Sequence, residues 1–310
     1  MTVFTFAQNV LSNQFNTSFS QRTLKEAISC QGRGLHTGCD VKMTLKPAPP
    51  NTGICFHRTD LSNFEIPALI EYVARVSYAT TLMRLGVMVA TVEHLLSALA
   101  GCQIDNCIVE LDSLEVPIMD GSSREFITLI KAAGVVEQSA ARVCLKVLAP
   151  LEVCDGNRRI KIEPAEEFSI NSLIDFPHPL IGKQMFSYSP SKTDYINEVA
   201  PARTFGFTKE LDALRQVGLI RGGSLENAIV LTENGLLNSE ALRFVDEFAR
   251  HKVLDILGDL ALIGRPIIGR VTAERSGHAL HAQLVSQLLR DSSSWKLIEQ
   301  ESLQQLAVAR

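Results

Sequence analysis

The stretch between Phe244 and about Ile263 has the hydrophobic pattern of a two-faced helix. At about 100° per residue, its apolar arc holds Val253, Leu254, Ile256, Leu257 and Leu260. The opposite arc is polar and holds His251, Lys252, Asp255 and Asp259. The i, i+4 spacing puts the His251 imidazole and the Asp255 carboxylate one turn apart on one face, where two such groups can share a metal ion. The alternative is a polar face that is simply solvated.

Strand-like and helical patterns follow one another in both halves of the chain. In the first half, strands are predicted at 23–29, 41–46, 66–85 and 106–111, and helices at 92–100 and 126–133. In the second half, strands are predicted at 143–153, 159–162, 169–175, 228–231 and 266–272, and helices at 209–217 and 279–289. The predicted helix caps are Thr91, the pair Ser122 and Glu125, and Thr208. The pattern predicts an α+β fold of two similarly built sheet-and-helix domains.

A short polar stretch at 137–142 contains few large apolar residues and is predicted to separate the two domains. Residues 21–138 then form the first domain and residues 139–310 the second. Residues 1–20 carry no Lys, Arg, Asp or Glu, so they lack the basic start of a secretory signal and the arginines of a transit peptide. We expect these residues to be an N-terminal extension.

Composition narrows the function classes. A net charge of −4 gives no reason to expect a nucleic-acid partner. The seven cysteines form no C-x-x-C pair, which favours reduced thiols over a zinc knuckle or a disulfide framework. No apolar run approaches the roughly 18 residues of a membrane-spanning helix. We therefore expect a cytoplasmic protein without stable membrane insertion.

A candidate metal centre combines residues from both halves. The predicted helix at 92–100 is mostly apolar, yet Glu93 and His94 open it, and buried charge is costly unless it is paired or bound. Catalytic zinc takes three protein ligands, which His94, His251 and Asp255 can supply. Glu93 adjoins a ligand as a general base would. His278 follows a glycine before a helix and is either a general acid or an ordinary N-terminal helix residue. The other histidines are predicted to lie on the surface: His57, His178 and His281.

Six motifs occur in order along the chain. They are T-V-E-H-L-L-S-A-L (91–99), P-I-M-D-G-S (117–122), A-R-T-F-G-F (202–207), G-G-S-x-x-N-A-I-V (222–230), H-K-x-L-D-x-x-G-D-L (251–260) and S-G-H-A-L (276–280). With Q-R-T-L-K (21–25) and G-L-H-T-G (34–38), they make residues 21 to about 289 resemble the UDP-3-O-acyl-N-acetylglucosamine deacetylases. These enzymes are the zinc amidases of lipid A synthesis.

The resemblance implies two α+β domains packed face to face, each with a small insert, and an active site between them. It implies that zinc, or Fe²⁺ in the cell, is bound by His94, His251 and Asp255. The implied catalytic residues are Glu93 as base, His278 as acid, Asp259 as the group that orients His278, and Thr204 as the oxyanion donor. The implied substrate-binding residues are Leu35, His36, Phe205, Gly223, Ser224, Lys252 and Arg275.

This sequence departs from the family pattern at two places. Arg275 stands in place of the lysine usual three residues before the acid histidine, and a guanidinium can also bind phosphate, with a different geometry. The cysteine that some members carry upstream of T-V-E-H is absent from 78–82.

An acyl channel is implied around 222–224, where the apolar candidates are Phe207, Leu211, Ile220, Leu225, Ala228 and Val230. Ordinary core packing is the other explanation for that cluster.

The implied reaction is hydrolysis of the acetamide of UDP-3-O-(3-hydroxyacyl)-N-acetylglucosamine. It releases acetate and UDP-3-O-acyl-glucosamine, the committed step of lipid A biosynthesis, and we expect a monomer. Two other classes remain open at this point. One is a nucleotide-sugar-binding protein that has lost activity, which the intact set of acids and imidazoles disfavours. The other is a different metal-dependent amidase such as a peptidase, which the phosphate-directed Lys252 and Arg275 disfavour.

Overall fold

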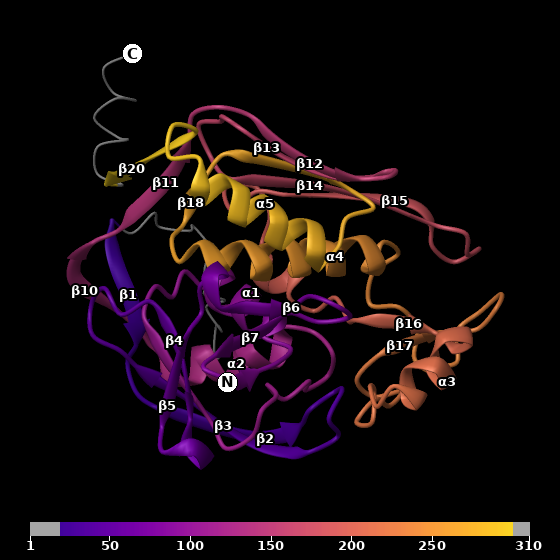
Figure 1. Ribbon diagram of the computed structural model, residues 1–310. Coiled ribbons are helices and arrows are strands. Elements are labelled where there is room, and N and C mark those ends of the chain that lie inside the picture. The colour runs from indigo at the N-terminus through magenta and orange to yellow at the C-terminus, as the bar shows by residue number, and fades with distance from the viewer. Residues whose placement is uncertain (1–18, 300–310) are drawn as a thin grey trace, which may run out of the picture.

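The computed structural model describes residues 19–299 and places helices between two large sheets (Figure 1). The first half contains β1 (Ser20–Leu24), β2 (Ile28–Arg33), β3 (Asp40–Pro47), β4 (Ile54–Arg58), β5 (Phe64–Pro67), β6 (Val73–Arg75), β7 (Thr81–Arg84), β8 (Val87–Val89), α1 (Glu93–Gly101), β9 (Cys107–Leu111), α2 (Arg124–Ala133) and β10 (Val135–Ala141). The second half contains β11 (Val143–Val147), β12 (Leu151–Asp155), β13 (Arg158–Glu163), β14 (Ser169–Phe176), β15 (Gly182–Tyr188), β16 (Phe205–Phe207), α3 (Thr208–Gln216), β17 (Ile229–Leu231), α4 (Glu247–Leu260), β18 (Ile267–Ile268), β19 (Arg270–Glu274), α5 (His278–Arg290) and β20 (Trp295–Glu299).

The two five-stranded sheets have the same topology. Their strand orders are β2-β3-β9-β4-β5 and β12-β13-β19-β14-β15. In each sheet one pair is parallel, β4 with β9 and β14 with β19, and the other neighbours are antiparallel. Each half runs through four strands, an insert, a helix, the fifth strand and a second helix. The first insert contains β6, β7 and β8, and the second insert contains β16, α3 and β17. The predicted α+β class with two similarly built units, each carrying an insert, is confirmed.

Alternating burial explains the sheets. In β3, the buried residues Val41, Met43 and Leu45 alternate with more exposed neighbours, and β13 buries Ile160 and Ile162 in the same way. Each sheet therefore has one apolar face to cover. In Figure 1, α4 and α5 lie under the second sheet and α1 faces α4, whereas α3 lies outside these layers beside β16 and β17.

Helix α4 is buried on nearly all sides. Of its fourteen residues, only Arg250 and Lys252 are not buried. The apolar arc packs into the core, and the polar arc faces α1 of the other half. The approach is close at Gly258, where an added Cβ would lie 2.0 Å from the carbonyl oxygen of Glu93. A solvated polar face is excluded.

The stretch predicted to separate the two domains is largely strand β10, which pairs with β1. The predicted helix caps do not form as expected. Thr91 does not cap α1, because it adopts a left-handed φ of 57° and its hydroxyl donates to Glu115 Oε1 over 2.8 Å. The Ser122 hydroxyl donates to Asp120 Oδ1 and accepts from the N–H of Arg124, while the N-cap of α2 is Ser123, so the predicted capping box of Ser122 with Glu125 does not form. Thr208 is itself the first residue of α3.

The predicted boundary between residues 138 and 139 falls inside β10, so the domain limits remain a prediction. Positions 1–18 of the predicted N-terminal extension lie outside the described residues. Within 19–299, no helix is long and apolar enough to cross a membrane. All seven cysteines are free thiols.

Candidate metal centre and catalytic site

Three potential metal ligands meet where the first turn of α1 faces α4. His94 comes from α1, and His251 and Asp255 come from α4; all three are buried. The Nε2 atoms of His94 and His251 lie 3.6 Å and 3.3 Å from the same oxygen, Asp255 Oδ1. Donor atoms at zinc-bond lengths of about 2.0–2.2 Å in tetrahedral geometry are separated by about this much. The residues present therefore fit a zinc ion.

The protonation states of His251 and Asp255 on α4 suit metal ligands. His251 Nδ1 donates to the carbonyl of Ala202 over 3.1 Å, which leaves Nε2 facing Asp255. Burial lowers the pKa of His251 to about 3, so its imidazole is neutral. Burial alone would raise the pKa of Asp255, but His251 and Lys252 hold it well below its usual value. Lys252 Nζ lies 2.7 Å from Asp255 Oδ2.

Glu93 lies beside this ligand set at the start of α1. Its Oε2 accepts a hydrogen bond of 3.0 Å from the backbone N–H of Thr80, and its Oε1 lies 3.9 Å from His278 Nε2. Burial raises the pKa of Glu93, as do Asp259 and Asp255, whereas His278 and His94 act in the other direction. A carboxylate whose pKa is raised toward neutrality can accept a proton and release it again.

Asp259 gathers three donors at the other end of the site. Its Oδ2 lies 2.7 Å from both His278 Nδ1 and His281 Nδ1, and its Oδ1 accepts from the Thr80 hydroxyl over 2.6 Å. Burial alone would lower the pKa of His278, but Asp259, with Glu93 and Asp255, raises it to about 10. The geometry holds His278 as an imidazolium whose Nε2 faces Glu93.

The sequence did not identify two residues of this site. The first is His281, which was predicted to lie on the surface but is fully buried between Asp259 and Ser276. The second is Thr80. His178, also predicted to lie on the surface, is buried as well, with Nε2 2.9 Å from the Thr232 carbonyl oxygen. The i, i+3 spacing of His278 and His281 on one helix is a signal that could have indicated a shared partner. Thr80, which contacts both Glu93 and Asp259, has no such signal because the three residues are distant in sequence.

The two loops predicted to bind substrate lie against each other. The N–H groups of Arg221 and Gly222 donate to the carbonyls of His36 and Leu35, over 3.2 Å and 3.0 Å. A Cβ on Gly223 would lie 3.7 Å from Leu35 Cδ1. The buried Glu115 carboxylate accepts from the N–H groups of His36 and Thr37. Burial lowers the pKa of His36, although Glu115 acts in the opposite direction.

Three more of the predicted site residues come from the second half: Thr204, Phe205 and Lys252. Thr204 donates its N–H to the Gly121 carbonyl over 2.8 Å. The ring of Phe205 packs edge-on near His251, with ring centroids 6.2 Å apart, and Lys252 Nζ lies 5.5 Å from the Phe205 centroid. Phe205 and Lys252 therefore lie beside the metal ligands His251 and Asp255.

Arg275 and Ser224 have local partners. The Arg275 guanidinium donates to the Asn157 carbonyl and lies 3.6 Å from Asp175. The backbone N–H of Ser224 donates to the Asn227 side chain. No contact between these two residues and the metal ligands is present in the described structure.

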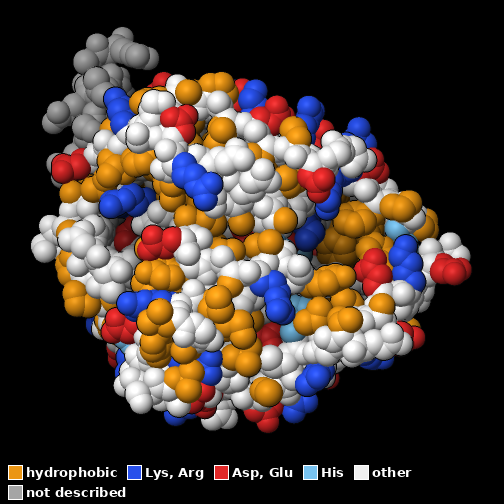
Figure 2. All heavy atoms as spheres, in the orientation of Figure 1, with side chains coloured by type: hydrophobic (Ala, Val, Ile, Leu, Met, Phe, Trp, Pro, Cys, Tyr) orange, Lys and Arg blue, Asp and Glu red, His pale blue; other side chains and the backbone are white. Residues whose placement is uncertain are grey.

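The insert of the second half carries the predicted acyl channel. Helix α3 buries none of its residues, Leu225 is exposed, and Val230 is buried. Phe207 packs on the small apolar cluster of Ile229, Leu231 and Phe248. Figure 2 shows hydrophobic side chains around a hollow where this insert meets the end of β15. Core packing therefore accounts for part of the predicted cluster, and its other members are half-buried or exposed.

Comparison with known proteins identifies the family. The family model described as UDP-3-O-acyl N-acetylglycosamine deacetylase matches residues 21–290. A UDP-3-O-acyl-N-acetylglucosamine deacetylase of Myxococcus xanthus is 51% identical over 283 residues, covering 91% of this chain and 90% of the relative. Proteins with the same name from Solibacter usitatus and Coxiella burnetii are 47% and 45% identical, covering 91% and 90% of this chain and 96% and 93% of those relatives. On this evidence, the chain belongs to the UDP-3-O-acyl-N-acetylglucosamine deacetylase family.

Proposed function

We propose that the protein hydrolyses the acetamide of UDP-3-O-acyl-N-acetylglucosamine, releasing acetate and a free glucosamine amine, as a step of lipid A biosynthesis. The observation that carries this proposal is the single buried site in which Glu93 and His278 face each other over 3.9 Å beside His94, His251 and Asp255. One group suited to accept a proton and one suited to donate it adjoin a three-ligand metal set.

The metal that this donor set suits best is zinc, with Fe²⁺ as the alternative in the cell. Two imidazole nitrogens and one carboxylate oxygen would hold it, from His94, His251 and Asp255. Zinc, when bound, supplies Lewis-acid activation of the amide carbonyl and of the attacking water. The short contact of Lys252 with Asp255 would keep that carboxylate ionised.

The protein's own groups move the protons. Glu93, held by the Thr80 N–H, takes a proton from water as the water attacks the amide carbon. Thr204 and the cationic His278 stabilise the negative charge that develops on the carbonyl oxygen. His278, kept protonated by Asp259, then donates its Nε2 proton to the departing amine. His281 and Thr80 complete the hydrogen bonds of Asp259 and so fix the orientation of His278.

Substrate groups are assigned by chemistry. Phe205 would pack on the sugar ring, and Lys252 and Arg275 would meet the nucleotide phosphates through their charge. The loops containing Leu35, His36, Gly223 and Ser224 would bind the remaining nucleotide, and the apolar surface of the second insert would take the acyl chain. Burial of that chain against exposed apolar side chains supplies a hydrophobic contribution to binding.

The proposed setting is the cytoplasm, which seven free cysteines favour. The proposed enzyme is a monomer.

Acetate release from UDP-3-O-(3-hydroxyacyl)-N-acetylglucosamine by the zinc-loaded protein tests the proposal. The same assay with unacylated UDP-N-acetylglucosamine and with an N-acetylated peptide serves as control. We expect turnover of the acylated nucleotide, with a much lower kcat/KM for the unacylated one and none for the peptide. Turnover of the peptide alone would support a different amidase, and binding of the nucleotide without acetate release would support a protein that has lost activity.

A further inference from the structure

A second cluster of metal-binding side chains lies on the first sheet, on strands that contribute nothing to the catalytic site. In β4, Phe56 is fully buried toward the core, so Cys55 and His57, one residue before and after it, share the opposite face. In the antiparallel partner β5, Glu65 pairs directly with His57, and Pro67 pairs with Cys55. Strand register therefore brings a thiol, an imidazole and a carboxylate to one face of one strand pair.

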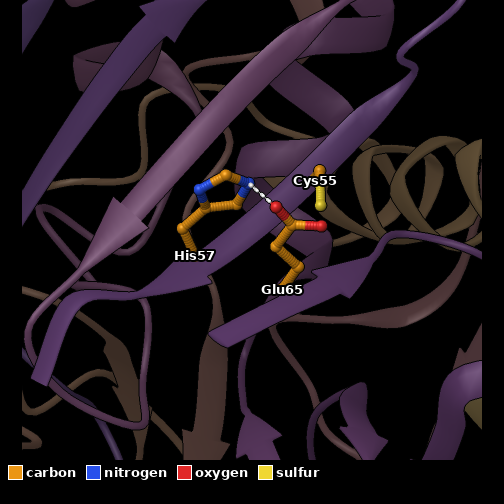
Figure 3. Close-up of side chains that lie close together, drawn as sticks. All are labelled: Cys55, His57 and Glu65. Carbon is orange, nitrogen blue, oxygen red and sulfur yellow. Dashed lines mark ion pairs between the residues drawn. The ribbon is translucent and has the colours of Figure 1, made fainter. Parts of the chain in front are cut away.

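The three side chains point toward one another (Figure 3). His57 Nε2 lies 3.8 Å from Glu65 Oε1, and one donor atom from each of the three residues falls within 4.8 Å of the other two. The Cys55 side chain is buried, the His57 side chain is 16% exposed and the Glu65 side chain is 61% exposed. The cluster thus has a closed side at the sulfur and an open side toward solvent.

We propose that Cys55, His57 and Glu65 bind a second divalent metal ion, with Zn²⁺ the preferred ion, apart from the catalytic centre. A sulfur, an imidazole nitrogen and a carboxylate oxygen are the three donor types that zinc uses in proteins. Their present separations need only a small contraction to reach the spacing of about 3.3–3.8 Å expected around a tetrahedral ion. Solvent on the Glu65 side supplies the fourth position.

The surroundings leave these donors available. Among the described residues, the Glu65 carboxylate has His57 as its only ion-pair partner, and Arg84 donates to the Glu65 backbone carbonyl instead. Burial raises the pKa of the Cys55 thiol to about 11, and Glu65 acts in the same direction. A coordinated cation reverses that balance, because a thiol that binds a metal loses its proton.

The expected consequence is structural. Strand β5 is the edge of its sheet, paired with β4 alone among the described strands, and it contacts the β7 and β8 strands of the first insert. A metal that joins Glu65 to Cys55 and His57 cross-links this edge strand to its neighbour. We expect it to stabilise the first half against unfolding without changing turnover, since no catalytic residue lies on β4 or β5.

Metal content and cobalt spectroscopy test the proposal on the full chain. The protein is loaded with Zn²⁺, passed through a desalting column and analysed for metal per chain, then loaded with Co²⁺ to look for sulfur-to-cobalt charge-transfer absorption near the ultraviolet. We expect two equivalents of zinc and a cobalt–thiolate band. Cys55→Ala and His57→Ala should each lose one equivalent and the band, and should keep normal acetate release.

Matched variants separate the two sites. Cys154→Ala removes an exposed free thiol and should keep two equivalents and the band. His251→Ala should lose the catalytic equivalent and keep the cobalt–thiolate band, so failure of the catalytic proposal is visible independently. One equivalent in wild type with no cobalt–thiolate band would overturn the inference and leave His57 and Glu65 as an ordinary cross-strand ion pair. A band that survives Cys55→Ala would overturn it as well.

Discussion

The two halves of the molecule share one topology and contribute different chemistry. The helix before the fifth strand is α1 in the first half and α4 in the second, and the two pack together. Helix α1 has nine residues and offers Glu93 and His94 in its first turn. Helix α4 has fourteen and offers His251, Asp255 and Asp259 over three turns. In the proposed roles, the base and one ligand come from one half, and the other ligands and the support of the acid come from the other half.

The inserts differ in the same way. The first insert contains Thr80, between β6 and β7. Its backbone N–H binds Glu93 and its hydroxyl binds Asp259, so it joins the two halves. The second insert presents apolar side chains and contacts Leu35 and His36 of the first half through its loop backbone. A repeated scaffold can therefore form one asymmetric site, because each copy supplies the groups that the other lacks.

The largest effect is expected from removing a ligand. In His251→Ala the metal retained should fall by one equivalent per chain and acetate release should be lost, because three protein ligands leave none in reserve. His94→Ala, from the other half, should behave in the same way. Metal analysis and an activity assay on both proteins check this, and full metal content in either variant would remove that residue from the ligand set.

Glu93 lies in the same turn as His94 but is assigned to proton transfer. Glu93→Ala should keep its metal, and kcat/KM should fall by about 10²–10⁴-fold, the usual contribution of a general base. The comparison with His94→Ala separates base from ligand within two adjacent residues. Loss of metal from Glu93→Ala would show that the separation is wrong.

Asp259 is expected to set the alkaline limit of activity. Because Asp259 raises the pKa of His278, the imidazolium persists to high pH and kcat/KM falls only as the pH passes that raised value. In Asp259→Asn the pKa of His278 should drop, and the alkaline limb should move to lower pH by about 1–3 units. Asp246→Asn, which removes a carboxylate paired with Arg250 at the start of α4, is the control and should leave the limb in place. An unmoved limb in Asp259→Asn would show that another group sets it.

The smallest effect is expected at the contact between the halves. Thr80→Val removes the hydroxyl that Asp259 accepts and keeps the backbone N–H that binds Glu93. A hydrogen bond to a charged group contributes about 1.5–3 kcal/mol, so kcat/KM should fall roughly tenfold or more and the alkaline limb should shift. Thr80→Ser retains the hydroxyl and should restore both values. If Thr80→Ser is as slow as Thr80→Val, packing of the methyl group matters instead.

The sequence alone predicted the elements that local patterns define. Apolar periodicity located α4 and α5, and spacing within α4 placed His251 and Asp255 one turn apart. Motif order indicated the family, which the comparisons confirm. Local signals worked less well at helix starts, because the Thr91 hydroxyl binds the Glu115 carboxylate and the Ser122 hydroxyl is shared between the Asp120 carboxylate and the N–H of Arg124.

Only the tertiary structure decided what the polar residues face. Periodicity reports one helix at a time, so it could not show that the polar arc of α4 is covered by α1 of the other half. Nor could it bring Thr80 and His281 to Asp259, because these contacts join residues far apart in the chain. The same holds for Cys55, His57 and Glu65, which strand register alone brings together. Sequence determined which groups are present, and packing determined which of them meet away from water, where their charges and protons interact most strongly.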